Sequence, residues 1–219
     1  MSNMAEKSIP LDLKDACVTA AHAVISEHGV EKLSLRDVAR KLNVSHQAPY
    51  KHYASRDHLL AEVIRRCFVR FSDALNARVR SIDTMQDMRA LCISYMDFAL
   101  HNPLEYRLMF GTPWPEAAAQ PEMLADARYS FDVLRGALKP LYEPLYEPLY
   151  KDLDAQRQGI DTAAMYVWST LHGLASIMQS QAMCGLELHP KYQENAVEQV
   201  MDLVTAGLEA STQKVNLSV

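Results

Sequence analysis

Apolar residues recur at intervals of three and four along most of the chain, which places them on one face of an α-helix. Glycine is scarce, at seven residues in 219, and runs of β-branched residues are short. The pattern therefore predicts an all-α fold.

Four helices are predicted in the N-terminal part. The first covers residues 11–28, and Gly29 stands where a helix commonly stops. The second covers residues 35–42 behind Ser34, whose hydroxyl suits an N-cap. A third short helix extends to about residue 53, and a long fourth helix follows. The predicted buried stripe of the fourth helix is Leu60, Ile64, Cys67, Phe68, Phe71 and Leu75.

Helical stripes continue beyond residue 83, with a short helix opening at Pro103. The apolar positions are Met88, Leu91, Cys92, Tyr95 and Ala99, then Leu124, Ala127, Phe131, Leu134 and Leu138. The last two helices are predicted at 161–184 and 190–210. The first of these has so little polar interruption that we expect it to be buried on nearly every side.

Residues 140–150 repeat the sequence Pro-Leu-Tyr-Glu. A proline at every fourth position removes backbone donors and clashes with the preceding turn, so the repeat predicts a linker of successive turns. The alternative is a tyrosine-lined edge of a ligand site.

The formal charge of −5 conceals an asymmetry between the two ends of the chain. Residues 1–80 hold 13 Lys and Arg against 9 Asp and Glu, a balance of +4, whereas residues 81–219 hold 9 against 18, a balance of −9. The N-terminal part is therefore suited to meet an anion.

Neither a membrane-spanning stretch nor a secretory signal is predicted, and we expect a cytoplasmic location.

The composition also limits the chemistry. The four cysteines, Cys17, Cys67, Cys92 and Cys184, lie far apart, and we expect reduced core thiols rather than a redox site. No metal site, no cofactor and no catalytic residue is predicted, because the sequence holds none of the common nucleotide-binding, nucleophile or zinc motifs. An enzyme and a helical adaptor for protein partners remain as the two rival hypotheses.

Residues 34–53 predict a helix-turn-helix. Two short helices are joined by three residues, with Val38, Ala39, Leu42 and Val44 facing inward. Asn43 occupies the turn, where asparagine tolerates a left-handed backbone. Short amphipathic helices with scattered basic residues also occur in ordinary bundles, which is the alternative.

A helix-turn-helix places the start of its second helix in the major groove of DNA. His46, Gln47 and Ala48 are then predicted to read bases, with Gln47 bonding adenine. Either Tyr50 or Tyr53 could instead be packed, and Pro49 removes one hydrogen bond from the helix. The predicted DNA-binding residues, including those suited to phosphates, are Ser34, Arg36, Ser45, His46, Gln47, Ala48, Tyr50, Lys51, His52, Tyr53 and Arg56.

Residues 13–64 resemble the N-terminal domain of TetR-family transcriptional regulators. The matching residues are Gly29, Ser34, Arg36, Asp37, Val38, Ala39, Asn43, Val44, Ser45, Tyr50, His52, Tyr53, Ser55, Arg56, Asp57, Leu59 and Leu60. The sequence departs from the commonest form at Asn43, Pro49 and Tyr53. The resemblance implies a three-helix DNA-binding domain, predicted at 1–58, and a helical ligand-binding and dimerisation domain at 59–219.

The stretch from Trp168 to Gly173 is similar to the Trp-x-x-x-His-Gly signature of one class of C-terminal domains in this family. That class implies a dimer with a ligand pocket in each C-terminal half. The predicted ligand residues are Tyr95, Met96, Phe98, Met109, Phe110, Trp114, Trp168 and His172. The alternative is structural, with Trp168 packed, His172 bonded internally and the methionines serving as ordinary core.

Together with the resemblance, these patterns predict a homodimeric regulator, a repressor with an activator as the alternative, that binds a palindromic operator in double-stranded DNA and is released by a small, mostly apolar effector. Symmetric half-sites require a twofold dimer. The predicted dimer interface is Leu171, Ala175, Val197, Val200, Val204 and Leu208.

Overall fold

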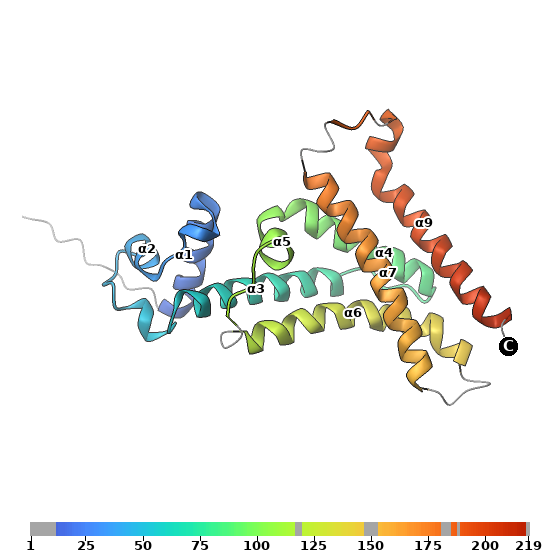
Figure 1. The fold of residues 1–219 in the computed structure, drawn as a ribbon, viewed down its shortest axis with the longest axis horizontal. Coiled ribbons are helices and arrows are strands. Elements are labelled where there is room, and N and C mark those ends of the chain that lie inside the picture. The colour runs from blue at the N-terminus through green and yellow to red at the C-terminus, as the bar shows by residue number, and fades with distance from the viewer. Residues whose placement is uncertain (1–11, 117–119, 147–152, 181–184, 188, 218–219) are drawn as a thin grey trace, which may run out of the picture. The chain divides into compact units, whose positions relative to one another are not determined.

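The structure is a computed structural model that describes residues 12–116, 120–146, 153–180, 185–187 and 189–217. Its described regular elements are all helical, as the all-α prediction requires (Figure 1). The α-helices are α1 (Leu13–His28), α2 (Leu35–Lys41), α3 (Arg56–Asn76), α4 (Thr84–His101), α5 (Pro103–Phe110), α6 (Pro121–Tyr146), α7 (Leu153–Gln179) and α9 (Pro190–Leu217). Two short 3-10 helices are η1 (Val30–Lys32) and η2 (Pro49–Lys51). None of the described helices is long and apolar enough to cross a bilayer.

Contacts divide the chain into two compact units. The N-terminal unit comprises residues 1–68 and 107–127, and the C-terminal unit comprises residues 69–106 and 128–219. The division differs from the predicted domain boundary between residues 58 and 59, which falls inside α3. The helices α3, α5 and α6 each contribute residues to both units.

Capping side chains begin the first two helices, and a glycine ends the first. The Asp12 carboxylate accepts the backbone N–H groups of Lys14 and Asp15, which satisfies two donors at the start of α1. Gly29 ends α1 with φ at 86°, a conformation that favours glycine. The Ser34 hydroxyl accepts the N–H of Asp37 at 3.1 Å and caps α2, as predicted.

The segment after α2 corrects one prediction. Asn43 has φ at 54°, the left-handed turn that its position predicts. Residues 46–48 then form turns and residues 49–51 a 3-10 helix, so the predicted α-helix up to residue 53 is wrong. Pro49 has no N–H to donate to Ser45, and the tighter i→i+3 bonds from Ala48 to Ser45 and from Lys51 to Ala48 form instead. We call residues 45–52 the recognition segment.

The predicted stripe of α3 is buried throughout. Its members Leu60, Ile64, Cys67, Phe68, Phe71 and Leu75 are each at most 3% exposed. The cysteines at positions 17, 67 and 92 are buried, as predicted, and burial raises the pKa of the Cys92 thiol to about 12. Cys184 lies outside the described residues.

Helices α4, α7 and α9 contact one another in the core of the C-terminal unit. The predicted stripe of α4 is buried in full. It shares this core with Val167, Leu171 and Ala175 of α7 and Met201, Val204 and Leu208 of α9.

The proline repeat does not begin as a linker. Helix α6 continues through Pro140 and Pro144 to Tyr146, so the prediction is wrong for residues 140–146. The fixed φ of proline suits a helix, and we attribute tolerance of the lost hydrogen bonds to the burial of Leu138 and Tyr142. Residues 147–150 lie outside the described residues.

Helix α7 also differs from its prediction. It begins at Leu153 rather than at residue 161, and it is not buried on every side. Met165, Tyr166 and Ile177 are 49%, 42% and 47% exposed. Helix α7 therefore keeps several apolar side chains exposed in a single chain.

An ion pair is buried between α4 and the residues that follow α3. The Arg78 guanidinium donates to both oxygens of Asp87, at 3.2 and 2.7 Å, and to the Leu75 carbonyl at 2.9 Å. The Arg78 side chain is 1% exposed and that of Asp87 12%. Burial alone would raise the pKa of Asp87, but the bonds from Arg78 outweigh it and hold that pKa below its usual value.

Candidate nucleic-acid interface

The turn after α2 orients the recognition segment. The N–H of Val44 donates to the Ala39 carbonyl at 3.0 Å, and Ala39 is fully buried, which permits a close crossing. Helix α2 contacts η2 directly. Two short elements joined by a tight turn are the geometry of a helix-turn-helix, in which the second element enters the major groove.

The predicted base-reading side chains lie at the start of the recognition segment. Ser45, His46 and Gln47 are exposed, and Ala48 is half-buried. An exposed amide at Gln47 is able to bond an adenine edge in two places, and the Ala48 methyl group suits a thymine methyl. The structure places these residues together in one turn.

The groups suited to phosphates flank that turn. Tyr50 is 51% exposed, and Lys51, His52 and Arg36 are exposed as well. In the described part of the chain Arg36 and Lys51 form no ion pair, whereas Arg40 pairs with Asp37 and Lys41 with Glu27. Two cations therefore remain available beside the recognition segment.

Tyr53 has an internal role instead of the predicted phosphate contact. It is 4% exposed, and its hydroxyl donates to the Lys14 carbonyl of α1 at 3.2 Å. Burial raises the pKa of this phenol, so it remains protonated and a donor. The packed alternative is the one that the structure shows for Tyr53, while Tyr50 stays exposed.

Ser34 and Arg56 also make internal bonds. The Ser34 hydroxyl donates to Asp37 at 2.5 Å. The Arg56 guanidinium donates to the carbonyls of Val30 and Leu33 at 2.8 and 3.1 Å. These bonds hold the loop before α2, and contact of the two residues with DNA stays a prediction.

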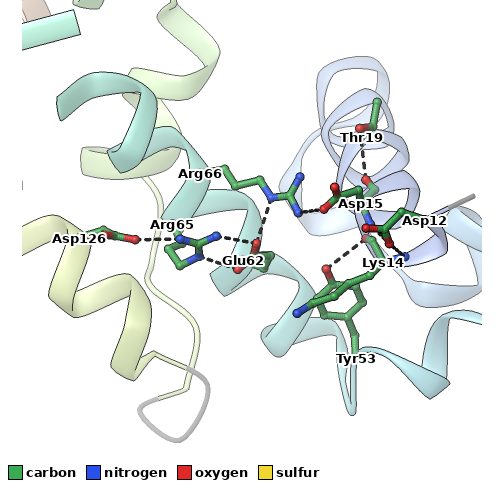
Figure 2. Close-up of polar contacts among 9 residues, drawn as sticks. All are labelled: Asp12, Lys14, Asp15, Thr19, Tyr53, Glu62, Arg65, Arg66 and Asp126. Atoms are coloured by element: carbon green, nitrogen blue, oxygen red, sulfur yellow. Dashed lines mark hydrogen bonds and ion pairs between the residues drawn. The ribbon is translucent and has the colours of Figure 1, made fainter. Parts of the chain in front are cut away.

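Sequence analysis missed a chain of ion pairs in the N-terminal unit, which Figure 2 shows. Glu62 of α3 accepts from Arg65 and Arg66, and these arginines reach Asp126 of α6 and Asp15 of α1. The i,i+3 and i,i+4 spacing within α3 was readable from the sequence. The partners 51 and 61 residues away were not.

The structure divides the predicted ligand residues between the two units. Met109, Phe110 and Trp114 belong to the N-terminal unit, where Phe110 and Trp114 pack edge-on against Phe68. The other five belong to the C-terminal unit. Of these, Met96 and Phe98 are buried core residues at 1% and 6% exposure.

Of the remaining three, Tyr95 and His172 join a polar relay in the C-terminal unit. The hydroxyls of Tyr95 and Tyr106 lie 2.7 Å apart, and the Tyr106 hydroxyl lies 2.7 Å from His172 Nδ1. The Trp168 ring packs against His172, with the ring centroids 6.0 Å apart. A tyrosine hydroxyl can both donate and accept, so the two bonds join Tyr95, Tyr106 and His172 in one row. Burial lowers the pKa of His172, which favours the neutral imidazole.

A hollow of about 620 Å³ lies elsewhere in the C-terminal unit. Its lining includes Tyr142 of α6, Tyr166 of α7 and Gly207 of α9, and none of the eight predicted ligand residues. The predicted ligand residues and this hollow therefore define two separate places.

Four of the six predicted dimer residues are already covered within one chain. Leu171, Ala175, Val204 and Leu208 are at most 2% exposed, and Val197 and Val200 are half-buried. Their stripes face the core shared with α4. The large apolar side chains that are exposed on the described parts of these helices are others: Leu153, Met165, Tyr166 and Ile177 on α7 and Leu203 on α9.

Two family models match the chain. The model of bacterial regulatory proteins of the tetR family covers residues 18–63. The model of the tetracyclin repressor-like C-terminal domain covers residues 88–204. The first match includes the helix-turn-helix.

Known proteins resemble the chain over different lengths. The HTH-type transcriptional regulator Rv1816 of Mycobacterium tuberculosis is 32% identical over 104 residues, which span 45% of this chain and 44% of that regulator. The HTH-type transcriptional activator FasR of Mycolicibacterium smegmatis is 27% identical over 49% of this chain and 51% of its own length. The chain thus spans about half the length of these relatives. A solved protein of unknown function from Rhodococcus sp. RHA1 is 25% identical, with a TM-score of 0.64 over 93% of this chain and 95% of its own.

A helix-turn-helix joined to a helical C-terminal domain defines the class of DNA-binding transcriptional regulators. Within that class, the chain belongs to the TetR family. This is a family of regulators, not of enzymes, and its members bind DNA.

Proposed function

We propose that the protein is a homodimeric repressor that acts in the cytoplasm, binds a palindromic operator and is released by a small, mostly apolar ligand. The observation that carries the proposal is the exposed recognition segment with two cations, Arg36 and Lys51, that form no ion pair among the residues the structure describes. Exposed Gln47 and His46 supply hydrogen-bonding groups for base edges, and the cations supply affinity for phosphates.

Selection of fragments from genomic DNA tests the proposal directly. The expected result is enrichment of one or a few promoter-proximal sites with twofold sequence symmetry. Half-sites are expected one helical turn apart, or a multiple of it, because two recognition segments of a symmetric dimer must face the same side of the duplex. Failure to enrich any sequence over random fragments would contradict specific operator binding.

Repression is supported by the repressor-like description of the matching C-terminal family. The name of the relative FasR marks that protein as an activator, so the two modes need a direct comparison. In vitro transcription from a selected promoter distinguishes them. Repression predicts that added protein lowers transcript yield, and activation predicts the reverse.

The dimer surface that we propose lies on the open faces of α7 and α9. Leu203 is 69% exposed and lies one turn before Gly207, whose backbone the Tyr166 hydroxyl approaches. Met165 and Ile177 of α7 are further apolar side chains that stay exposed in a single chain. An exposed apolar surface of this kind commonly marks a protein contact.

We expect Leu203→Glu to convert a dimer into monomers, because the charge would have to be desolvated in the interface. Sedimentation velocity at micromolar concentration measures the change. Val79→Glu is the matched control, since Val79 is 88% exposed in the loop before α4, and it should leave the dimer intact. A monomeric parent protein would contradict the dimer proposal.

The ligand that we propose binds in the C-terminal unit beside the relay. Trp168 and His172 are only half-buried, whereas Tyr95, Met96 and Phe98 of the contacting helix α4 are buried and mostly apolar. An apolar site with a few oriented polar groups suits a small apolar molecule that carries one or two hydrogen-bonding atoms.

The ligand should weaken the binding of operator DNA, and operator DNA should weaken the binding of the ligand by the same factor. Linkage requires that operator DNA weaken the ligand by the factor by which the ligand weakens the DNA, typically about 5- to 150-fold. Thermal-shift screening identifies the ligand, and calorimetry with and without saturating operator measures the factor. Equal affinities in the two titrations would mean that the ligand does not control DNA binding.

A further inference from the structure

Five charged side chains form an alternating ladder across three helices of the N-terminal unit (Figure 2). Asp126 of α6 accepts from Arg65 Nη1 at 3.0 Å. Arg65 donates to both oxygens of Glu62, at 2.7 and 2.9 Å. Glu62 also accepts from Arg66 Nε at 2.9 Å, and Arg66 donates to Asp15 of α1.

Glu62 is the centre of this ladder. Its side chain is 18% exposed, and burial alone would raise its pKa, but the bonds from the two arginines outweigh burial and keep that pKa below the usual value. The carboxylate thus stays charged and holds both arginines. Arg65 and Arg66 are consequently engaged inside the unit, although a basic pair on a helix could be taken for a phosphate contact.

The ladder ends beside the residue that fixes the recognition segment. Asp15 follows Lys14, whose carbonyl accepts the buried hydroxyl of Tyr53. Tyr53 comes directly after the recognition segment, which ends at residue 52. The Asp12 carboxylate accepts the N–H groups of both Lys14 and Asp15, which links the two residues in the first turn of α1.

At its other end the ladder begins in a segment remote in sequence from the recognition segment. Asp126 belongs to residues 107–127, which pack on α3 within the N-terminal unit. The same segment contacts Phe68 through Phe110 and Trp114, and the Glu116 N–H donates to Asp57 at 3.4 Å. From residue 128 onward α6 belongs to the C-terminal unit. Asp126 therefore lies within two residues of the point where the helix changes unit.

We propose that Asp126 is a positioning residue for DNA binding, which acts through Arg65, Glu62, Arg66 and Asp15 on the turn of α1 that holds Tyr53. The inference rests on the proposed function. A recognition segment that is already held in its binding geometry loses less conformational entropy when it contacts DNA. Loss of the outer carboxylate leaves Arg65 with Glu62 alone and loosens the ladder from that end.

The direction of the change in DNA affinity distinguishes a positioning role of Asp126 from the effect of its negative charge. Asp126→Asn removes one negative charge, and charge alone would strengthen the attraction to the polyanion. Positioning predicts the opposite, a weaker complex, by about 2- to 30-fold. The salt dependence of binding should not change, because no phosphate contact is lost.

Fluorescence anisotropy with a duplex selected by the parent protein measures these affinities. Asp132→Asn is the matched control, because Asp132 also lies on α6 but pairs with Arg135 in the C-terminal unit. It gives the effect of the charge alone. Asp126→Glu keeps the carboxylate and should restore most of the affinity.

Tyr53→Phe tests whether Asp126 acts through the turn of α1 that accepts the Tyr53 hydroxyl. If both residues act through the same turn of α1, the double variant with Asp126→Asn should lose less affinity than the product of the single losses. Affinities are taken well below the unfolding transition of each variant, which urea unfolding locates.

Three results would overturn the positioning role: unchanged or tighter binding by Asp126→Asn, an equal loss in Asp132→Asn, or no recovery in Asp126→Glu. A parent protein that binds no duplex would instead overturn the proposed function, so the two failures are distinguishable.

Discussion

Replacement of Asp87 by alanine should lower the free energy of unfolding by about 3–5 kcal/mol. The change leaves the Arg78 guanidinium, whose side chain is 1% exposed, without its carboxylate partner. The energy lost is mainly the cost of an uncompensated buried charge, because the intact pair only offsets its own desolvation. Urea unfolding of the parent and variant proteins measures the difference.

The pH dependence of stability provides a second check on this pair. The folded-state pKa of Asp87 lies below its ordinary value of 3.8. Its stabilisation is therefore fully present above pH 3.8 and is lost as the pH falls through the lower, folded-state value. The alanine variant should lack this part of the acid dependence.

Asp202→Ala is the control for surface charge. Asp202 pairs with Arg89, but its side chain is 70% exposed, so the expected loss is at most about 1 kcal/mol. An equally small loss in Asp87→Ala would mean that water or another group replaces the buried partner.

Replacement of Lys51 by alanine should weaken binding to every duplex sequence. The lysine is exposed, unpaired in the described residues and next to Tyr50, so it is suited to a phosphate rather than to a base. A charge-assisted hydrogen bond contributes about 1.5–3 kcal/mol, which corresponds to a loss of roughly 10- to 150-fold. The slope of log K against log salt should become shallower by about 0.9.

Gln47→Ala is the companion variant, with a different signature. It should relax the preference at one base position of each half-site by about 1–3 kcal/mol and leave the salt slope unchanged. Anisotropy titrations over a series of salt concentrations separate the two effects. If both variants bind like the parent, the recognition segment does not enter the groove.

Local signals in the sequence account for most of the helices. Asp12, Ser34 and Gly29 mark helix ends through short-range bonds, and the stripe of α3 is buried at every predicted position. Periodicity does not say what covers a stripe, however. Val204 and Leu208 face the core of their own chain, whereas Leu203 on the same helix is the exposed apolar residue.

Two errors concern proline. At Pro49 the missing donor changes an expected α-helical turn into a 3-10 helix, because the segment is too short to absorb the loss. At Pro140 the helix continues, since Leu138 and Tyr142 are buried around it. Both prolines lack the same backbone donor. Burial of the neighbouring side chains decides whether the α-helix continues.

The sequence places His46, Gln47, Tyr50 and Lys51 directly after the turn, and the structure shows them exposed. Their contact with DNA stays a prediction. The internal role of Tyr53 depends on Lys14, 39 residues away, and the ladder depends on Asp126, 61 residues from Arg65. Such long-range partners leave no local signal, so only the structure shows which polar residues are already engaged.

Dimethyl sulfate protection of a selected duplex tests the central claim most directly, because the reagent methylates guanine N7 in the major groove and adenine N3 in the minor groove. If the recognition segments of a dimer occupy successive major grooves, guanine N7 should be protected in two clusters centred about 10 base pairs apart, or a multiple of this spacing. Adenine N3 should stay reactive between them. Protection confined to adenine N3, or no protection on a duplex that the protein binds, would contradict the account.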